Sequence, residues 1–109
     1  MPENRKCLQV IVEDIDTYDG APLHEAILRF LHRKGVAGAT AWFGIEGYGS
    51  SQVIHKQGLF GMSDERPVVI VAIDAEDRLR AVLPDLLAMA QDAMITLSDV
   101  EVFQRSGRG

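Results

Sequence analysis

A chain of 109 residues is long enough for one domain with a modest core and too short for two. Its hydrophobic content of 47% and charged content of 25% are typical of a soluble globular protein, and it has no apolar run of about 18 residues that could cross a bilayer. The net charge is −5 and the basic residues are scattered along the chain, so neither binding to nucleic acid nor direct membrane insertion is expected.

The first predicted element is a strand, because Leu8, Val10 and Val12 recur at every second position. Residues 1–6 hold no apolar stretch of signal-peptide length, so we expect a cytoplasmic protein. The lone Cys7 has no partner for a disulfide or a zinc site. We interpret it as a small, buried strand residue.

A helix is predicted next. Pro22 fits the first turn of a helix, apolar side chains recur at helical spacing over residues 23–31, and Gly35 stops the pattern. His24 and His32 lie off the apolar stripe and point in different directions. They are therefore expected to be surface histidines that do not share a metal ion.

The acidic stretch over residues 13–19 also raises the question of a metal site. It lacks the glycine and the terminal glutamate of a calcium loop. We predict a solvated loop that ends in a turn at Asp19-Gly20, and no metal.

The second half of the chain predicts two strands and a helix. Residues 39–46 indicate a strand that glycines close, and residues 67–73 indicate a strand that is apolar on both faces. Asp74 with Asp77 resembles a helix start, and an apolar helical stripe follows over residues 79–90.

Pro84 interrupts this stripe, so we expect a kink or a break into two short helices near residues 80–83. The last strand is predicted over residues 95–103, with room for a bulge at residues 98–99. Residues 104–109 are expected to be a frayed tail.

The element order predicts an α+β fold: the ferredoxin-like split βαβ arrangement (βαββαβ), with a four-stranded antiparallel sheet and two helices on one face. A single domain spans residues 1–109, with an ordered core of about 7–103. The third strand is apolar on both faces, and Trp42 and Phe43 lie on opposite sides of the second. Because no further element is available to cover the second face, we expect another copy of the chain to cover it.

Nineteen residues without helical period separate Gly47 from Pro67, far more than the about two to five of an ordinary hairpin. Glycines at the base of this loop can turn backbone N–H groups toward an anion, and serines can bond phosphate oxygens. A twisted strand end with a tight turn explains the same residues, and both interpretations stay open. The candidate ligand-binding residues are Gly44, Glu46, Gly47, Tyr48, Gly49, Ser50, Ser51, His55 and Lys56.

The loop offers no paired nucleophile and base, so no catalytic residue and no enzymatic activity are expected. Its tip, residues 57–62, carries two glycines and three apolar side chains, which suit a contact surface. We predict that residues 48–66 are the most mobile part of the chain. The alternative is that residues 51–55 and 59–62 extend the flanking strands as a ribbon.

Several motifs carry a resemblance to a known family. They are Tyr18-Asp-Gly-Ala-Pro-Leu-His-Glu-Ala-Ile27, Gly35-Val-Ala-Gly-Ala-Thr40 and Gly44-Ile-Glu-Gly-Tyr-Gly49, extended by His55, Pro67-Val-Val-Ile70, Val82-Leu-Pro84 and Thr96-Leu-Ser-Asp-Val-Glu-Val102. Over roughly residues 8–103 the chain resembles the domain of unknown function 190 family, within the superfamily of nitrogen regulatory PII-like signalling proteins.

The resemblance implies a ferredoxin-like homotrimer with residues 48–66 in the place of the PII signalling loop. It also implies a small-ligand site in the cleft between subunits, where PII relatives bind adenine nucleotides and transmit the bound state to a partner protein. No other cofactor is implied.

The chain departs from the PII pattern at the phosphate clamp. Residues 89–95 contain no glycine or lysine where PII proteins have both, and Phe43, Gly58 and Gly61 stand where the closer family is expected to have basic residues. A less charged ligand such as a mononucleotide, or no nucleotide, fits better. The alternatives are a ligand-free structural or interaction protein and a metal- or ion-tolerance trimer, in each case without enzymatic activity.

Overall fold

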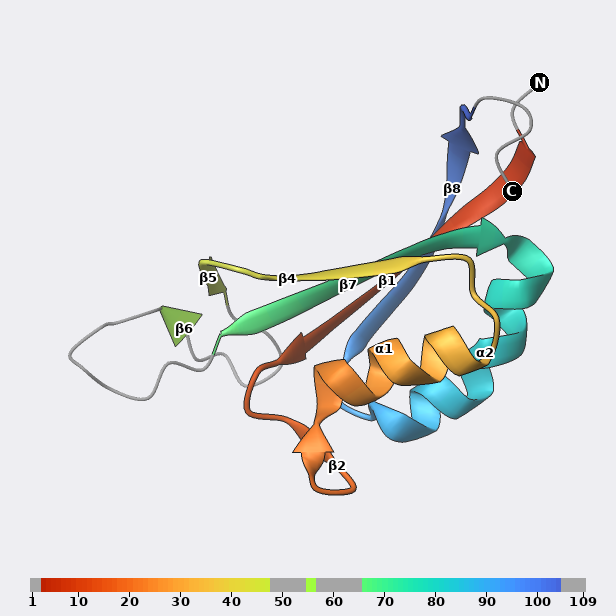
Figure 1. Cartoon of the computed structure of the whole chain (residues 1–109). Helices are drawn as coiled ribbons and strands as arrows, with labels where there is room; N and C mark the ends of the chain where they lie inside the picture. Colours follow the sequence, from red (N-terminus) through yellow and green to blue (C-terminus); the bar gives the residue numbers. More distant parts are fainter. Residues whose placement is uncertain (1–2, 48–54, 57–65, 105–109) are drawn as a thin grey trace.

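The computed structural model describes residues 3–47, 55–56 and 66–104, and it has two layers, a four-stranded antiparallel sheet with both helices on one of its faces (Figure 1). The strands are β1 (Glu3–Glu13), β2 (Thr17–Tyr18), β3 (Ala21–Pro22), β4 (Ala39–Phe43), β5 (Glu46–Gly47), β6 (His55–Lys56), β7 (Pro67–Ala75) and β8 (Met94–Val102). The helices are α1 (Leu23–Arg33) and α2 (Glu76–Met89). The main sheet has the order β4-β7-β1-β8, which confirms the predicted ferredoxin-like fold.

The longest strand, β1, lies in the middle of the sheet and pairs with β7 on one side and β8 on the other. It starts at Glu3, earlier than the apolar alternation indicates, because β8 pairs with it from that residue onward. The pairing runs without interruption from Glu3 opposite Val102 to Ile11 opposite Met94. The predicted bulge at residues 98–99 is therefore wrong.

The hydrophobic core lies between the sheet and the two helices. Strands β1 and β7 contribute every second residue to it, and the helices contribute one stripe each. The fully buried large side chains are Leu8, Val10, Ile27, Leu31, Val68, Ile70, Leu79 and Leu86. At about 1.5–3 kcal/mol for each buried aliphatic side chain, this layer is the main source of stability.

The connection from β1 to α1 is a small hairpin formed by β2 and β3. Its turn is Asp19-Gly20, with φ values of 52° and 80°, which confirms the turn predicted there. Pro22 ends β3 at φ −57° and ψ 134°, so it precedes α1 and does not lie in its first turn as predicted. Gly35, at φ 81°, follows the last residues of α1 and confirms the predicted helix end.

The start of α2 differs from the prediction. Asp74 remains in β7, where it is 5% exposed, and the helix begins two residues later at Glu76. The Asp74 carboxylate accepts hydrogen bonds from the N–H groups of Ala37 and Ala75, so it bonds strand and loop backbone and does not cap the helix. Helix α2 continues as one element through Pro84, which excludes the predicted break into two helices, while the alternative of a kink stays a prediction.

Strand β4 ends at Phe43, earlier than the predicted end at Glu46. Three residues later, at Glu46, the chain pairs again, as β5 with β6, in a separate two-stranded ribbon. Residues 48–54 and 57–65 lie outside the described part of the chain. The predictions of mobility, of a contact surface at residues 57–62, and of longer ribbon strands fall on them and stay predictions.

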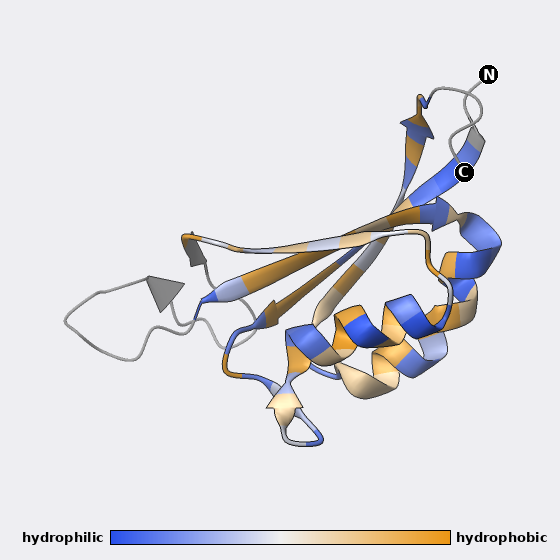
Figure 2. Cartoon of the chain, viewed as in Figure 1, coloured by the Kyte–Doolittle hydropathy of each residue, from blue (hydrophilic) through white to orange (hydrophobic). Residues whose placement is uncertain are grey.

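The sheet face opposite the helices carries an apolar row across all four strands. Trp42 of β4 lies opposite Val69 of β7, Val69 opposite Ile11 of β1, and Ile11 opposite Met94 of β8. Trp42 is 49% exposed and Met94 is 63% exposed. Figure 2 shows β7 as hydrophobic over most of its length, which confirms that this strand is apolar on both faces.

Candidate functional site

The contacts at the base of the long loop centre on Arg66, the residue before β7. Its N–H donates to Asp14 Oδ1 at 3.0 Å, and its carbonyl accepts from the N–H of Asp14 at 2.9 Å. The guanidinium Nε lies 3.6 Å from Asp14 Oδ2. Three contacts to one residue therefore hold the end of the loop against the chain that follows β1.

The side chain of Arg66 also stacks on an aromatic ring. Its guanidinium carbon lies 4.0 Å from the centre of the Phe43 ring, at the end of β4. His24 of α1 also meets this ring edge-on, with centroids 6.3 Å apart and planes at 69°. We call Asp14, His24, Phe43 and Arg66 the loop-base cluster.

Two polar atoms of this cluster have no hydrogen-bond partner within the described residues: Nδ1 of His24 and Nε of Arg66, both buried. His24 is half-buried, so the prediction of a surface histidine is wrong for it, because Phe43 packs against its ring. His32 is exposed, as predicted. A guanidinium held by stacking and by one carboxylate keeps donors for a further acceptor.

Gly44, the first predicted ligand-binding residue, has a different task in the structure. Its N–H donates to the carbonyl of Pro67 at 2.7 Å, so this donor is already used. A Cβ at position 44 would lie 2.7 Å from Cγ of Pro67. The glycine is required by the close approach of the two strand ends.

Four of the other predicted site residues are brought together by the ribbon of β5 and β6. Glu46 lies opposite Lys56, and Gly47 lies opposite His55. Tyr48, Gly49, Ser50 and Ser51 lie outside the described residues. Their assignment as ligand-binding residues stays a prediction.

Sequence reasoning did not include Asp14, His24 or Phe43 among the candidates. Asp14 and Arg66 are 52 residues apart, and no local pattern connects them. Phe43 stands out in the sequence as a strand residue and as the residue standing where a basic side chain is expected. The one sequence signal for this cluster is Arg66 itself, which follows Asp64 and Glu65 at the far end of the same loop.

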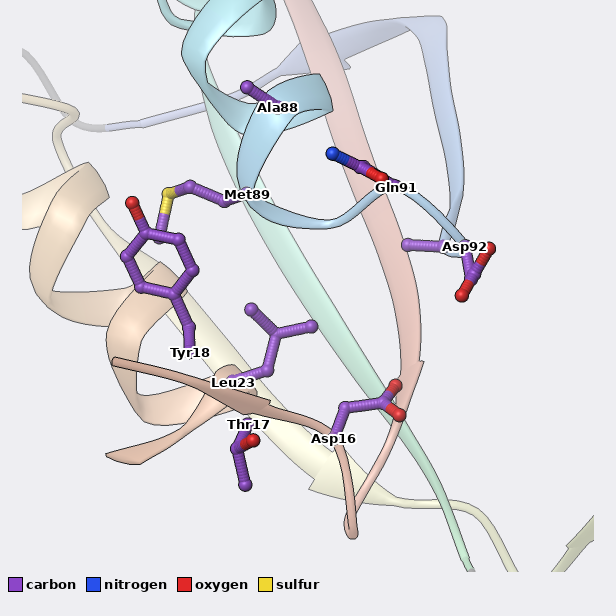
Figure 3. Close-up of a pocket in the computed structure, with 9 residues that line it drawn as sticks. Asp16, Thr17, Tyr18, Leu23, Ala88, Met89, Gln91 and Asp92 are labelled. Carbon is purple, nitrogen blue, oxygen red and sulfur yellow. The ribbon is translucent and has the colours of Figure 1, made fainter. Parts of the chain in front are cut away.

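A cavity of about 350 Å³ lies between the β2–β3 hairpin and the turn from α2 to β8 (Figure 3). It is lined by Asp16, Thr17, Tyr18, Leu23, Ala88, Met89, Gln91, Asp92 and Ala93. This turn is the segment where the PII phosphate clamp would stand. Among the described residues no basic side chain lines the cavity, and this lining does not suit a phosphate.

Within the described ranges, no group of three or more His, Cys, Asp and Glu side chains is arranged to hold a metal ion. No helix in these ranges is long and apolar enough to cross a membrane.

The sequence profile of the DUF190 family, described as "Uncharacterized ACR", matches residues 5–102. The chain belongs to the DUF190 family. A UPF0166 protein of Aquifex aeolicus is 32% identical to this DUF190 chain over 98 residues, covering 90% of it and 92% of the relative. A UPF0166 protein of Methanocaldococcus jannaschii is 31% identical over 100 residues, covering 91% and 92%.

Among solved structures, the DUF190 chain is similar to CPII, a nitrogen regulatory PII-like protein from Thiomonas intermedia K12. The structure of CPII bound to ADP, AMP and bicarbonate has a TM-score of 0.63 at 22% identity, covering 95% of this chain and 92% of CPII. A second, bound to ADP and bicarbonate, has a TM-score of 0.62 at 23% identity, covering 95% and 93%. The DUF190 chain therefore has a PII-like fold.

Proposed function

We propose that the protein is a PII-like regulatory trimer without enzymatic activity. It binds an adenine nucleotide in the cleft between subunits, next to the loop-base cluster. Residues 48–66 pass the bound state to a partner protein. The observation that carries this proposal is the Arg66 guanidinium held over Phe43 at the base of that loop.

Arg66 supplies a positive charge at the base of the long loop. The family resemblance expects a basic residue before Gly44, where this chain has Phe43. Arg66 reaches the same place from the other end of the loop and stacks on that phenylalanine. One guanidinium can bond a single phosphate group through two parallel hydrogen bonds, which favours a nucleotide with few phosphate groups over a triphosphate.

The similarity to CPII supports an adenine nucleotide as the ligand class, since CPII is solved with ADP and AMP bound. The Glu46–Lys56 and Gly47–His55 pairs support the proposal, because they join both sides of the long loop in one ribbon close to β4. A ligand that bonds Arg66 therefore acts on the two ends of the segment that is proposed to signal.

The test is calorimetric titration of ADP and AMP into the wild type and into Arg66→Gln. This substitution removes the guanidinium and leaves the two backbone hydrogen bonds to Asp14. Loss of a charged hydrogen bond of about 1.5–3 kcal/mol weakens binding roughly tenfold or more. Arg29→Gln, on the exposed face of α1, is the matched control and should bind as the wild type does.

Two results would contradict the proposal. If both arginine variants bind equally well, Arg66 does not hold the ligand. If the wild type binds neither nucleotide, the ligand-free interaction protein becomes the better interpretation.

A further inference from the structure

We propose that the cavity between the β2–β3 hairpin and the α2–β8 turn binds a small organic cation, an amine or guanidine carried on a short aliphatic stem. This site is separate from the loop-base cluster and does not depend on a nucleotide. The residues that carry the argument are Asp16, Tyr18, Leu23, Met89, Gln91 and Asp92.

The lining has an acidic side and an apolar side. In Figure 3 the carboxylates of Asp16 and Asp92 lie on one side, Tyr18 and Met89 lie on the other, and Leu23 lies between them. An elongated ligand with a charged head and an apolar stem matches this division. The volume of about 350 Å³ falls within the usual range for small-molecule sites.

The charge of the cavity is not compensated from within the described chain. Asp16 accepts one hydrogen bond, from the N–H of Glu13 at 3.0 Å, and a carboxylate has further lone pairs to offer. Neither Asp16 nor Asp92 forms an ion pair with another described residue. A bound cation would supply the missing charge.

Helix α2 adds to the negative potential of the cavity. Its last turn, which lines the cavity, holds no basic residue, whereas the last turn of α1 carries His32 and Arg33. Because the C-terminal end of a helix is the negative end of its dipole, a cation there is favourable. The two carboxylates and the helix end therefore favour a positively charged head group, and the apolar side of the cavity favours an aliphatic stem.

The geometry also connects this cavity to the long loop. The carbonyl of Asp16 accepts from the N–H of Leu23 at 2.7 Å, and the N–H of Asp16 donates to Glu13. Asp14, inside this short turn, holds Arg66 by three contacts. A ligand bonded to Asp16 therefore lies two residues along the chain from Asp14, which holds Arg66 at the end of the long loop.

The test uses pentylamine and 1-pentanol as probes, because they share a stem and differ in charge. Amide chemical shifts of the full-length protein are followed by NMR while each probe is added. Pentylamine should shift the amides of residues 16–23 and 89–93 in a saturable way at about 10 mM, and 1-pentanol should not.

Three variants locate the charge. Asp92→Asn and Asp16→Asn should each raise the Kd of pentylamine about fivefold, and Asn at position 16 keeps an oxygen for the N–H of Glu13. Asp85→Asn, an exposed carboxylate of α2 outside the cavity, should leave the Kd unchanged.

Equal shifts with the alcohol, equal weakening by Asp85→Asn, or no saturable shift would each overturn the proposal. So would MgCl2 if it produced the same shifts at a lower concentration than pentylamine, because the site would then be one for divalent ions. Failure of nucleotide binding would leave this result untouched.

Discussion

Asp74 joins three parts of the molecule through one buried carboxylate. It accepts the N–H of Ala37 at 2.9 Å, and its oxygens lie 3.3 Å from Arg78 and 3.7 Å from Arg5. Arg78 in turn donates to the carbonyl of Gly35 at 2.9 Å. The loop between α1 and β4 is thereby tied to the end of β7 and to the first turn of α2.

Replacing Asp74 with Ala should lower the free energy of unfolding by about 2–4 kcal/mol, because it removes the carboxylate that two backbone N–H groups and two guanidinium groups share. Urea denaturation measures the loss. Asp85→Ala, on the exposed face of α2, is the control and should change stability by less than about 0.5 kcal/mol. A loss no larger than that of the control would mean that the carboxylate is dispensable.

Gly44 gives a second test at the scale of one residue. Gly44→Ala places a Cβ 2.7 Å from the Pro67 ring, so the two strand ends must separate, and the expected cost is about 1–3 kcal/mol. Gly38→Ala meets nothing within 4 Å and should be nearly neutral. Chemical denaturation measures the free energy of unfolding of both variants. Equal values would show that the two strand ends can separate without loss of stability.

The candidate site was only partly predictable at this scale, for a physical reason. The glycines around position 44 are visible in the sequence, and an anion nest and a close strand approach both demand them. Only the contact with Pro67 separates these explanations, and that contact depends on how two distant strand ends meet. The contacts between Asp14 and Arg66 depend on the tertiary fold in the same way.

At the scale of elements, patterns that repeat along the chain gave correct predictions, whereas the errors came from single residues such as Asp74 and Pro84. The apolar alternation of β7 and the stripe of α1 follow from burial, which acts on every second or every third to fourth residue. Asp74 resembled a helix start only because its backbone partners on a neighbouring loop were unknown. Pro84 is exposed, and one missing hydrogen bond did not end a helix whose apolar stripe is buried on both sides of it.

The pairing of β1 with β8 includes an ion pair with a predictable pH dependence. Lys6 lies opposite Asp99, and its ammonium donates a hydrogen bond to the Asp99 carboxylate. This bond lowers the pKa of Asp99 from its ordinary 3.8 and raises the pKa of Lys6 from its ordinary 10.5. A carboxyl with a lowered folded-state pKa stabilises the fold above its unfolded pKa, and the contribution disappears as the pH falls through the folded pKa.

Asp99→Asn should therefore be slightly less stable than the wild type at neutral pH, with a difference that vanishes as the pH falls through the lowered pKa of Asp99. It should also vanish at alkaline pH, once Lys6 loses its proton above its raised pKa. Urea midpoints measured across the pH range give this difference directly. A difference that is constant with pH would contradict the ion-pair explanation.

At the scale of the whole molecule, the apolar row of Trp42, Val69, Ile11 and Met94 lies on the face that the helices leave uncovered. In the proposed trimer this face is buried between subunits, as the hydrophobic effect requires of so continuous a row. Val69→Lys places a charge in the middle of it and should dissociate the oligomer, as light scattering after size exclusion would detect.

The matched control is Leu87→Lys, which places the same charge on an exposed leucine of α2. It should leave the oligomer intact. A wild-type monomer, or a Val69→Lys protein with unchanged mass, would contradict burial of this face between copies.

The central position of β1 has a consequence for synthesis on the ribosome. The first strand of the sheet to emerge needs two partners, and both come late: β7 from Pro67 and β8 from Met94. Until then its backbone donors and acceptors lie open along both edges, which invites pairing with other chains. A nascent chain stalled before Met94 still has one open edge on β1, so the native sheet can close only after the residues of β8 have left the exit tunnel.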